Sequence, residues 1–346
     1  MKVWLDALTP KQGRLIASLA NVLKEDGYEV LVTCRDYECT YFSIKLYGLE
    51  PVVVGIHGGS TNLGKLVADG ERILALSRLV DSFKPHVLIS YPNPSASRVA
   101  FGLGSKYVAF NDTPHAVAAN RLALPLCDAL VASEALQGDF DSFLLPGTRV
   151  TYYKGVDEAI WVKRFIPKGI TARGLNLEER RYVIVRPEEY KAAYYSWEGW
   201  SWLELCEELK RKGFSVVVLP RYEEQRLAAL KRGFTVPSSC IDGMDLTYYA
   251  AAVVTGGGTM AREAALLGVP SYYMFPLELK VSNLVSAIGF PLKRWRGSPR
   301  ELAEEIASIE ISEIEESILK AKSLLDKIET PEKILAGILT DLLGSN

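Results

Sequence analysis

The pattern of residues 250–263 predicts a buried strand, a turn of three glycines and the first turn of a helix. Glycine lets the backbone approach a ligand closely, and the N–H groups at a helix start favour an anion. Glu263 lies one helical turn beyond the glycines, where its carboxylate suits the hydroxyl groups of a ribose. The alternative is a turn that only joins a strand to a helix. The residues expected to cradle a phosphate are Gly256, Gly257, Gly258 and Thr259.

Two arginines follow predicted strands in the same half of the chain. Arg186 comes directly after residues 182–185, and Arg221 comes shortly after residues 215–219. Ligands of open α/β sheets bind at the carboxyl ends of the strands. We therefore expect both guanidinium groups to lie at the edge that carries the glycine turn, as countercharges for an anionic ligand.

Candidates for proton transfer lie in the other half. Asp112 and His115 follow a predicted strand at residues 106–111, so an acid and an imidazole stand three residues apart at its carboxyl end. Asp6 lies near the carboxyl end of the first predicted strand. We expect Asp112, held or protonated by His115, to be catalytic, with Asp6 as a further candidate. A capping role for Asp112 in the turn is the alternative, and the two roles can coexist.

Residues 57–66 come close to a phosphate-binding P-loop. Gly59, Gly64 and Lys65 match its spacing, but Leu66 stands where a serine or threonine would ligate magnesium. The pattern therefore argues against an ATPase or kinase of that class. Lys65 remains a candidate phosphate or sugar contact, with a solvated lysine as the alternative.

The elements that must position these residues alternate between strand and helix in both halves. Thr9 and Pro10 have the form of a helix N-cap and first residue, and the helix they begin completes a βαβ unit. The first turn lacks G-x-G-x-x-G, so a dinucleotide cofactor is not expected there. The fold class predicted is α/β, with two Rossmann-like domains. Strands are expected at residues 2–8, 29–33, 51–56, 86–90, 106–111, 129–132, 182–185, 215–219 and 253–258.

These elements predict four regions along the chain. Residues 1–154 form an N-terminal Rossmann-like domain on the acceptor side, and residues 155–179, which are rich in glycine and aromatic residues, form a linker. Residues 180–310 form a second Rossmann-like domain that binds the donor. Residues 311–346 form C-terminal helices that pack on or across the domains.

Composition excludes several classes of protein. The 346 residues carry 40 Lys and Arg against 42 Asp and Glu, a formal charge of −2 that argues against binding of nucleic acid or an anionic membrane. No apolar run approaches the roughly 18 residues of a transmembrane segment. The five cysteines are widely spread without C-x-x-C spacing, which argues against a zinc site or a disulfide framework. We expect a cytoplasmic protein without a metal site.

The two Rossmann-like halves, with a glycine turn and a glutamate in the second, resemble the GT-B glycosyltransferase fold. That fold includes the non-hydrolysing UDP-N-acetylglucosamine 2-epimerases. Over nearly its whole length the chain is similar to an uncharacterised prokaryotic family of this fold, domain of unknown function 354. The motifs that carry the resemblance are Tyr153-Lys154-Gly155, Arg186-Pro187, Lys191-Ala192-x-Tyr194, Asn111-Asp112-Thr113-x-His115-Ala116 and Gly256-Gly257-Gly258-Thr259-Met260.

The resemblance implies that a nucleotide-diphosphate sugar binds in the interdomain cleft, with its diphosphate on residues 256–259, its ribose on Glu263 and Arg186 as countercharge. In such transferases a group of the first domain activates the acceptor, and the helix dipole and cations, rather than a metal, stabilise the leaving diphosphate. Relatives carry histidines after the first strand, where this chain has Thr9-Pro10-Lys11-Gln12-Gly13. Asp112, His115 and Asp6 remain as candidates for the base.

The expected function is a metal-independent glycosyltransferase with a nucleotide-diphosphate sugar, such as a UDP-sugar, as donor substrate and no tightly bound cofactor. The acceptor is open, a lipid-linked molecule or a glycan, and so is the oligomeric state. One alternative is a nucleotide-sugar 2-epimerase, which needs several acids in the first domain, where Asp6, Asp112 and Glu134 are available. The other is a non-catalytic binding or scaffold protein that has lost its base.

Overall fold

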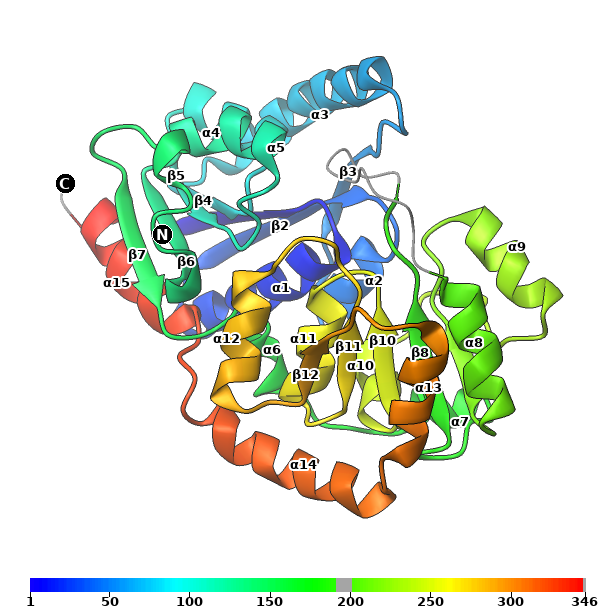
Figure 1. The fold of residues 1–346 in the computed structure, drawn as a ribbon. Helices are drawn as coiled ribbons and strands as arrows, with labels where there is room; N and C mark the ends of the chain where they lie inside the picture. The colour runs from blue at the N-terminus through cyan, green and yellow to red at the C-terminus, as the bar shows by residue number, and fades with distance from the viewer. Residues whose placement is uncertain (191–200, 345–346) are drawn as a thin grey trace. The chain divides into compact units, whose positions relative to one another are not determined.

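The computed structural model describes residues 1–190 and 201–344. The chain groups into two compact units (Figure 1): Met1–Trp161 with Glu329–Asn346, here called unit 1, and Val162–Ile328, called unit 2. The four regions expected from the sequence, with limits at residues 154, 179 and 310, stay a prediction. Each unit contains its own sheet, so the α/β class with two Rossmann-like halves is confirmed.

Unit 1 is built on a seven-stranded sheet in the order β3-β2-β1-β4-β5-β6-β7, and every neighbouring pair is parallel. The central strands consist almost entirely of buried apolar residues, as expected of strands covered on both faces. The strands are β1 (Lys2–Ala7), β2 (Glu29–Asp36), β3 (Val52–Ile56), β4 (Val87–Ser90), β5 (Lys106–Phe110), β6 (Ala129–Ser133) and β7 (Arg149–Tyr153).

Helices cover both faces of this sheet. From β1 to β3 the chain moves toward one edge of the sheet, and from β3 onward it crosses back toward the other edge. Because such crossover connections are right-handed, α1 and α2 lie on one face of the sheet and α3 and α4 on the opposite face (Figure 1). Thr9 caps α1 as predicted, because its side chain accepts a hydrogen bond from Gln12 N. The helices are α1 (Pro10–Glu25), α2 (Thr40–Lys45), α3 (Asn62–Phe83), α4 (Pro94–Gly102), α5 (Val117–Ala123) and α6 (Ala159–Val162).

Unit 2 contains a five-stranded parallel sheet in the order β12-β11-β10-β8-β9. Its core lies between this sheet and α8, α13 and α14, where Val183, Leu205 and Ile306 are buried together. The strands are β8 (Tyr182–Arg186), β9 (Ser215–Val218), β10 (Ala252–Thr255), β11 (Ser271–Tyr273) and β12 (Leu292–Arg294). The helices are α7 (Ile170–Gly174), α8 (Trp202–Arg211), α9 (Glu223–Lys231), α10 (Gly243–Tyr248), α11 (Thr259–Leu266), α12 (Lys280–Ile288), α13 (Pro299–Ser308) and α14 (Ile311–Leu325).

The C-terminal segment returns to unit 1. Glu329 N donates a hydrogen bond to Lys154 O at 3.0 Å, and Lys154 N donates one to the Glu329 carboxylate at 2.7 Å. Asp341 of α15 (Glu332–Leu343) pairs with Arg149 on the edge strand β7. Unit 1 is therefore assembled from two separate stretches of sequence. Over the described residues, no helix combines the length and apolar character needed to cross a bilayer.

Candidate functional site

The glycine turn lies at the carboxyl edge of the unit 2 sheet, between β10 and α11. The turn is tied to the neighbouring strand, because Gly256 N donates to Arg186 O at 2.9 Å. Thr255 Oγ1 accepts from Gly257 N at 3.1 Å. The turn is thus held by β8 and β10 before α11 begins.

The three glycines stand in the turn for different reasons. None of them has a positive φ, so conformation alone does not require glycine. A Cβ on Gly256 would lie 2.5 Å from Glu188 Cα, a backbone atom, so packing within unit 2 excludes a side chain there. One on Gly258 would lie 2.6 Å from Leu279 Cδ1, so this flexible side chain would have to move. A Cβ on Gly257 would come no closer than 3.8 Å to a neighbour, Arg221 Nη2. Protein packing therefore does not account for glycine at position 257.

The first turn of α11 offers backbone donors. Its N-cap is Gly258, which provides no side-chain acceptor for the N–H groups that begin the helix. Such groups carry the positive end of the helix dipole. Glu263 follows one turn later and is 9% exposed. An anion at the start of α11 would supply the acceptors that the N-cap lacks.

Both predicted arginines lie at this same edge. Arg186 is the last residue of β8, and it pairs with Thr255 of β10 in the parallel register. Arg221 follows β9, and its Nη1 lies 3.4 Å from Glu189 Oε2. The structure thus brings Arg186, Arg221 and the glycine turn together on three adjacent strands, β9, β8 and β10.

The carboxyl edge of the unit 1 sheet is acidic. Lys11, at the start of α1, pairs with Asp112, which follows β5. The same ammonium nitrogen lies 3.4 Å from Asp157 Oδ2 and 3.8 Å from Glu158 Oε1, which both follow β7. Three carboxylates from two strand ends therefore meet one lysine, in a group that we call the Lys11 cluster.

The buried end of the Lys11 cluster is Asp157, which is 3% exposed. Its two carboxylate oxygens accept hydrogen bonds from the hydroxyl groups of Tyr91 and Tyr153. Lys11 Nζ also lies over the Tyr91 ring, 5.0 Å from its centroid. Asp157 is therefore fixed by an ammonium and two phenols that come from α1, β7 and the segment after β4.

Burial determines the protonation states in this cluster. Burial and the nearby carboxylates raise the pKa of both Tyr91 and Tyr153 far above its usual value, so both phenols keep their protons. Burial also raises the pKa of Asp157, and Asp112 and Glu158 add to the rise while Lys11 opposes it. In these contacts three carboxylates share the Lys11 ammonium.

The open end of the Lys11 cluster is Asp112, whose side chain is 10% exposed. Thr113 Oγ1 donates to its Oδ1 at 2.8 Å. His115 is close enough for Asp112 to act on its titration, because burial lowers the His115 pKa and the Asp112 charge partly offsets this. The lowered pKa favours the neutral imidazole at pH 7, and the pairing of Asp112 with His115 stays a prediction.

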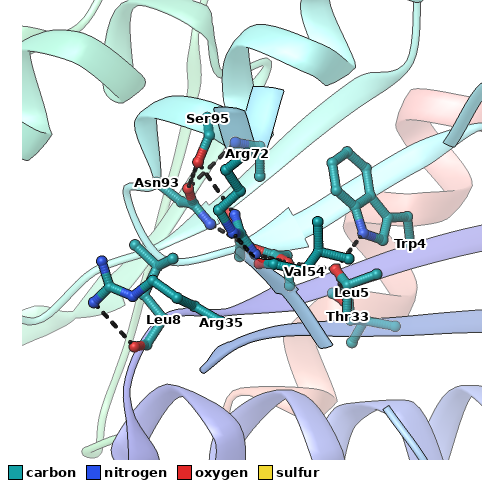
Figure 2. A network of polar contacts seen from close by, with 12 residues as sticks. Trp4, Leu5, Leu8, Thr33, Arg35, Val54, Arg72, Asn93 and Ser95 are labelled. Carbon is teal, nitrogen blue, oxygen red and sulfur yellow. Dashed lines mark hydrogen bonds and ion pairs between the residues drawn. The ribbon is translucent and has the colours of Figure 1, made fainter. Parts of the chain in front are cut away.

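Asp6 occupies a different environment, a polar network to which Thr33, Arg72 and Asn93, labelled in Figure 2, belong. It is fully buried, and its Oδ1 lies 2.7 Å from Arg72 Nη2. Thr33 and Asn93 also donate to its carboxylate. Arg72 is held in turn by Val54 O at 2.8 Å and Ser95 Oγ at 3.2 Å. This network joins β1, β2, β3, α3 and α4, and it accounts for Asp6 as a structural residue.

The P-loop-like segment has a structural explanation too. A Cβ on Gly58 would collide with the carbonyl oxygen of Gly64, and one on Gly64 would collide with that of Gly58. The two glycines let the segment fold back on itself at the start of α3. Thr61 caps this helix by accepting from Gly64 N at 3.1 Å.

Sequence reasoning missed Lys11 as a site residue, together with Asp157 and Glu158. The signal was the run 152–158, in which two adjacent acids follow an aromatic pair, but the sequence analysis assigned residues 155–158 to the linker. Lys191 and Tyr194 of the family pattern lie outside the described residues. Across the described ranges, no group of three or more His, Cys, Asp or Glu side chains is placed to hold a metal ion.

Comparison with known proteins identifies the family. Residues 1–286 match the family described as protein of unknown function DUF354. The chain belongs to the DUF354 family. It is 28% identical over 295 residues to an uncharacterized protein of Methanocaldococcus jannaschii, which covers 81% of this chain and 83% of that protein.

Solved structures agree with the GT-B fold of this DUF354 protein. The UDP-GlcNAc 2-epimerase of Neisseria meningitidis, bound to UDP-GlcNAc, superposes with a TM-score of 0.64 at 15% identity over 100% of both chains. The spinosyn forosaminyltransferase SpnP superposes with a TM-score of 0.62 at 13% identity over 99% of both chains. At such identities the likeness shows the fold alone.

Proposed function

We propose that this DUF354 protein binds a nucleotide-diphosphate sugar through the glycine turn of unit 2 and transfers the sugar to an acceptor. The observation that carries this proposal is Gly257. A Cβ on Gly256 would collide with the Glu188 backbone and one on Gly258 would displace Leu279, whereas one on Gly257 would meet its nearest neighbour, Arg221 Nη2, at an ordinary contact distance of 3.8 Å. A backbone without side chains beside guanidinium groups and a helix N-terminus suits a diphosphate.

The chemistry of transfer is assigned to the Lys11 cluster. In this proposal the acceptor hydroxyl gives its proton to Asp112 while its oxygen bonds to the anomeric carbon of the sugar. The bond between that carbon and the diphosphate oxygen breaks, and the nucleoside diphosphate leaves with the electron pair. The start of α11, Arg186 and Arg221 stabilise the charge on the leaving group.

The comparisons support the ligand class. Structures of the same fold are described as bound to UDP-GlcNAc, from Neisseria meningitidis, and as acting in glycosyl transfer, in SpnP. The resemblance covers both units of the present chain. We therefore expect the nucleotide to occupy unit 2, where the glycine turn is.

The test is ligand binding to the full chain, measured by calorimetry and thermal shift with UDP, GDP and their sugars. Gly257→Ala should lower affinity for the diphosphate at least tenfold with little change in melting temperature, because the added methyl would meet its protein neighbours only at ordinary contact distances of 3.8 Å or more. The matched control is Gly174→Ala, whose Cβ would meet nothing within 4 Å in unit 2. It should bind like the wild type. If no nucleotide or nucleotide sugar binds the wild type, the proposal is wrong.

A second candidate is a nucleotide-sugar 2-epimerase, and the observation that favours it is the number of acids in unit 1. Elimination and re-addition of the nucleotide require groups that remove and return protons, and Asp157 and Glu158 supplement Asp112 in this respect. Incubation of a UDP-sugar with the protein in D2O, without acceptor, separates the two. An epimerase inverts C2 and incorporates deuterium there, whereas a transferase does neither.

A further inference from the structure

The Lys11 cluster contains more acid than an ion pair needs, and this excess calls for an explanation. A single lysine beside a single aspartate stabilises the carboxylate and lowers its pKa by roughly one to three units. Such an aspartate is a weak base at neutral pH, because a general base works best when its pKa is near the working pH. A plain Lys11–Asp112 pair would therefore hinder proton abstraction by Asp112.

Two further carboxylates near Lys11 oppose its effect on the Asp112 pKa. Asp157 Oδ2, 3.4 Å from Lys11 Nζ, and Glu158 Oε1, 3.8 Å from it, draw on the same ammonium that pairs with Asp112. Asp157 and Glu158 are 3% and 1% exposed, so solvent screens their charges weakly. Asp112 alone of the three carboxylates reaches the surface to an appreciable extent.

We propose that Asp157 is a positioning residue that sets the basicity of Asp112: together with Glu158 it divides the Lys11 ammonium among three carboxylates. The tyrosines fix this arrangement, because Tyr91 and Tyr153 each hold one oxygen of Asp157. The charged and titratable groups described near Asp112 include Lys11 from α1, His115 from its own loop, and the acids and phenols named above. This inference rests on the proposed role of Asp112 as the base.

The arrangement of the cluster also predicts in which direction the Asp112 pKa changes when Asp157 is substituted. Asp157→Asn keeps the shape of the side chain but removes one negative charge from the group. Lys11 then acts more strongly on Asp112, and the Asp112 pKa falls. We expect the acid limb of the pH profile of kcat/KM to move down by roughly one pH unit, with a lower rate at neutral pH. A merely structural role would change stability but leave the limb in place.

The experiment compares the pH–rate profiles of full-length wild type, Asp157→Asn and Glu158→Gln, with melting temperatures recorded for each. Glu158→Gln should shift the limb in the same direction but less, because its oxygen is farther from Lys11. If Asp157→Asn does not fold, the shift measured for Glu158→Gln tests the inference in its place. The matched control is Asp128→Asn, which removes another lysine-paired aspartate of unit 1, 2.9 Å from Lys106, and should leave the profile unchanged.

A readout that does not need turnover separates this inference from the proposed function. The Asp112 carboxyl is titrated by 13C NMR in wild type and in Asp157→Asn, with Asp112→Asn identifying the signal. A downward shift in Asp157→Asn supports the inference even if no nucleotide sugar is turned over, a result that would count against the proposed function alone. An unchanged or raised Asp112 pKa overturns the inference even in an active enzyme.

Discussion

The carboxyl edges of the two sheets have opposite chemistry. In unit 1 the edge gathers the acids of the Lys11 cluster, whereas in unit 2 it gathers Arg186 and Arg221 around a turn without side chains. Both edges arise from the same arrangement of parallel strands followed by helices. The difference shows that the fold supplies only the location. The residues directly after each strand decide whether the edge handles protons or anions.

The largest effect should come from the acidic edge. Asp112→Asn should lower turnover by roughly 10²–10⁴-fold, because the amide does not accept the proton of the acceptor. Affinity for the nucleotide should stay within about twofold, since the donor is assigned to unit 2. Steady-state kinetics and calorimetry on the same preparation check both values. Loss of nucleotide affinity in this variant would contradict the division of roles between the two edges.

A second substitution asks whether the acidic edge includes Asp6. Arg72→Met should destabilise the protein by about 3–5 kcal/mol, because it leaves the Asp6 carboxylate buried without its ion partner. Urea denaturation measures the loss. Asp6→Asn should also destabilise but keep turnover per folded molecule. Full stability with lost turnover in Asp6→Asn would instead make Asp6 part of the catalytic group.

A third substitution compares the two glycine-rich turns. Gly58→Ala should cost about 1–3 kcal/mol of stability, because its Cβ would collide with the Gly64 carbonyl, and should leave nucleotide affinity unchanged. Gly257→Ala should lower nucleotide affinity and leave stability nearly unchanged. Chemical denaturation and calorimetry on the two variants test this exchange of effects. Equal loss of affinity in both would return the P-loop-like segment to the list of ligand sites.

The smallest effect is expected at the N-terminus of α7, where a carboxylate of the protein already accepts the backbone hydrogen bonds. Asp245 accepts hydrogen bonds from the backbone N–H groups of Lys168, Gly169 and Thr171 at 2.7–2.8 Å, where α7 begins. Burial raises the Asp245 pKa, but these donors outweigh burial and lower it overall. The carboxylate therefore stabilises the fold above the unfolded pKa of about 3.9, and this contribution is lost as pH falls below that value.

Asp245→Asn should remove roughly 1 kcal/mol of stability at pH 7 and flatten the fall in stability below pH 4. Denaturation at several pH values measures both changes. Both α7 and α11 have a glycine N-cap without a capping side chain of its own, so the variant isolates what the Asp245 carboxylate contributes at the start of α7. An unchanged acid limb in Asp245→Asn would show that the three backbone donors do not favour the charged form.

Much of the fold could be predicted because the buried strands are apolar runs. The segments 106–111 and 182–185 correspond to β5 and β8 within one residue at each end. By contrast, β7 (Arg149–Tyr153) was not predicted, because this edge strand is mostly part-exposed and mixes polar with aromatic residues. The acids that follow it were therefore placed in a linker.

The candidate site was predictable only where one segment carries its own signal. The glycine turn and the pair Asp112 and His115 each lie within a few residues of sequence. The Lys11 cluster joins residues from three separate parts of the sequence, positions 11, 112 and 157–158, and their meeting depends on the order of seven strands. Local patterns do not encode that order. Lys11 was recognised only as part of a helix start.

The return of the C-terminal segment to unit 1 affects how this chain is made. Glu329 contacts Lys154, directly after β7, and Asp341 pairs with Arg149 of β7; both contacts form only after all of unit 2 has been synthesised. Until then the edge strand β7, a place where another nascent chain can pair, lacks them. A circular permutant that begins at residue 329 would supply these contacts first. Its refolding yield would show how much aggregation the natural order of synthesis risks.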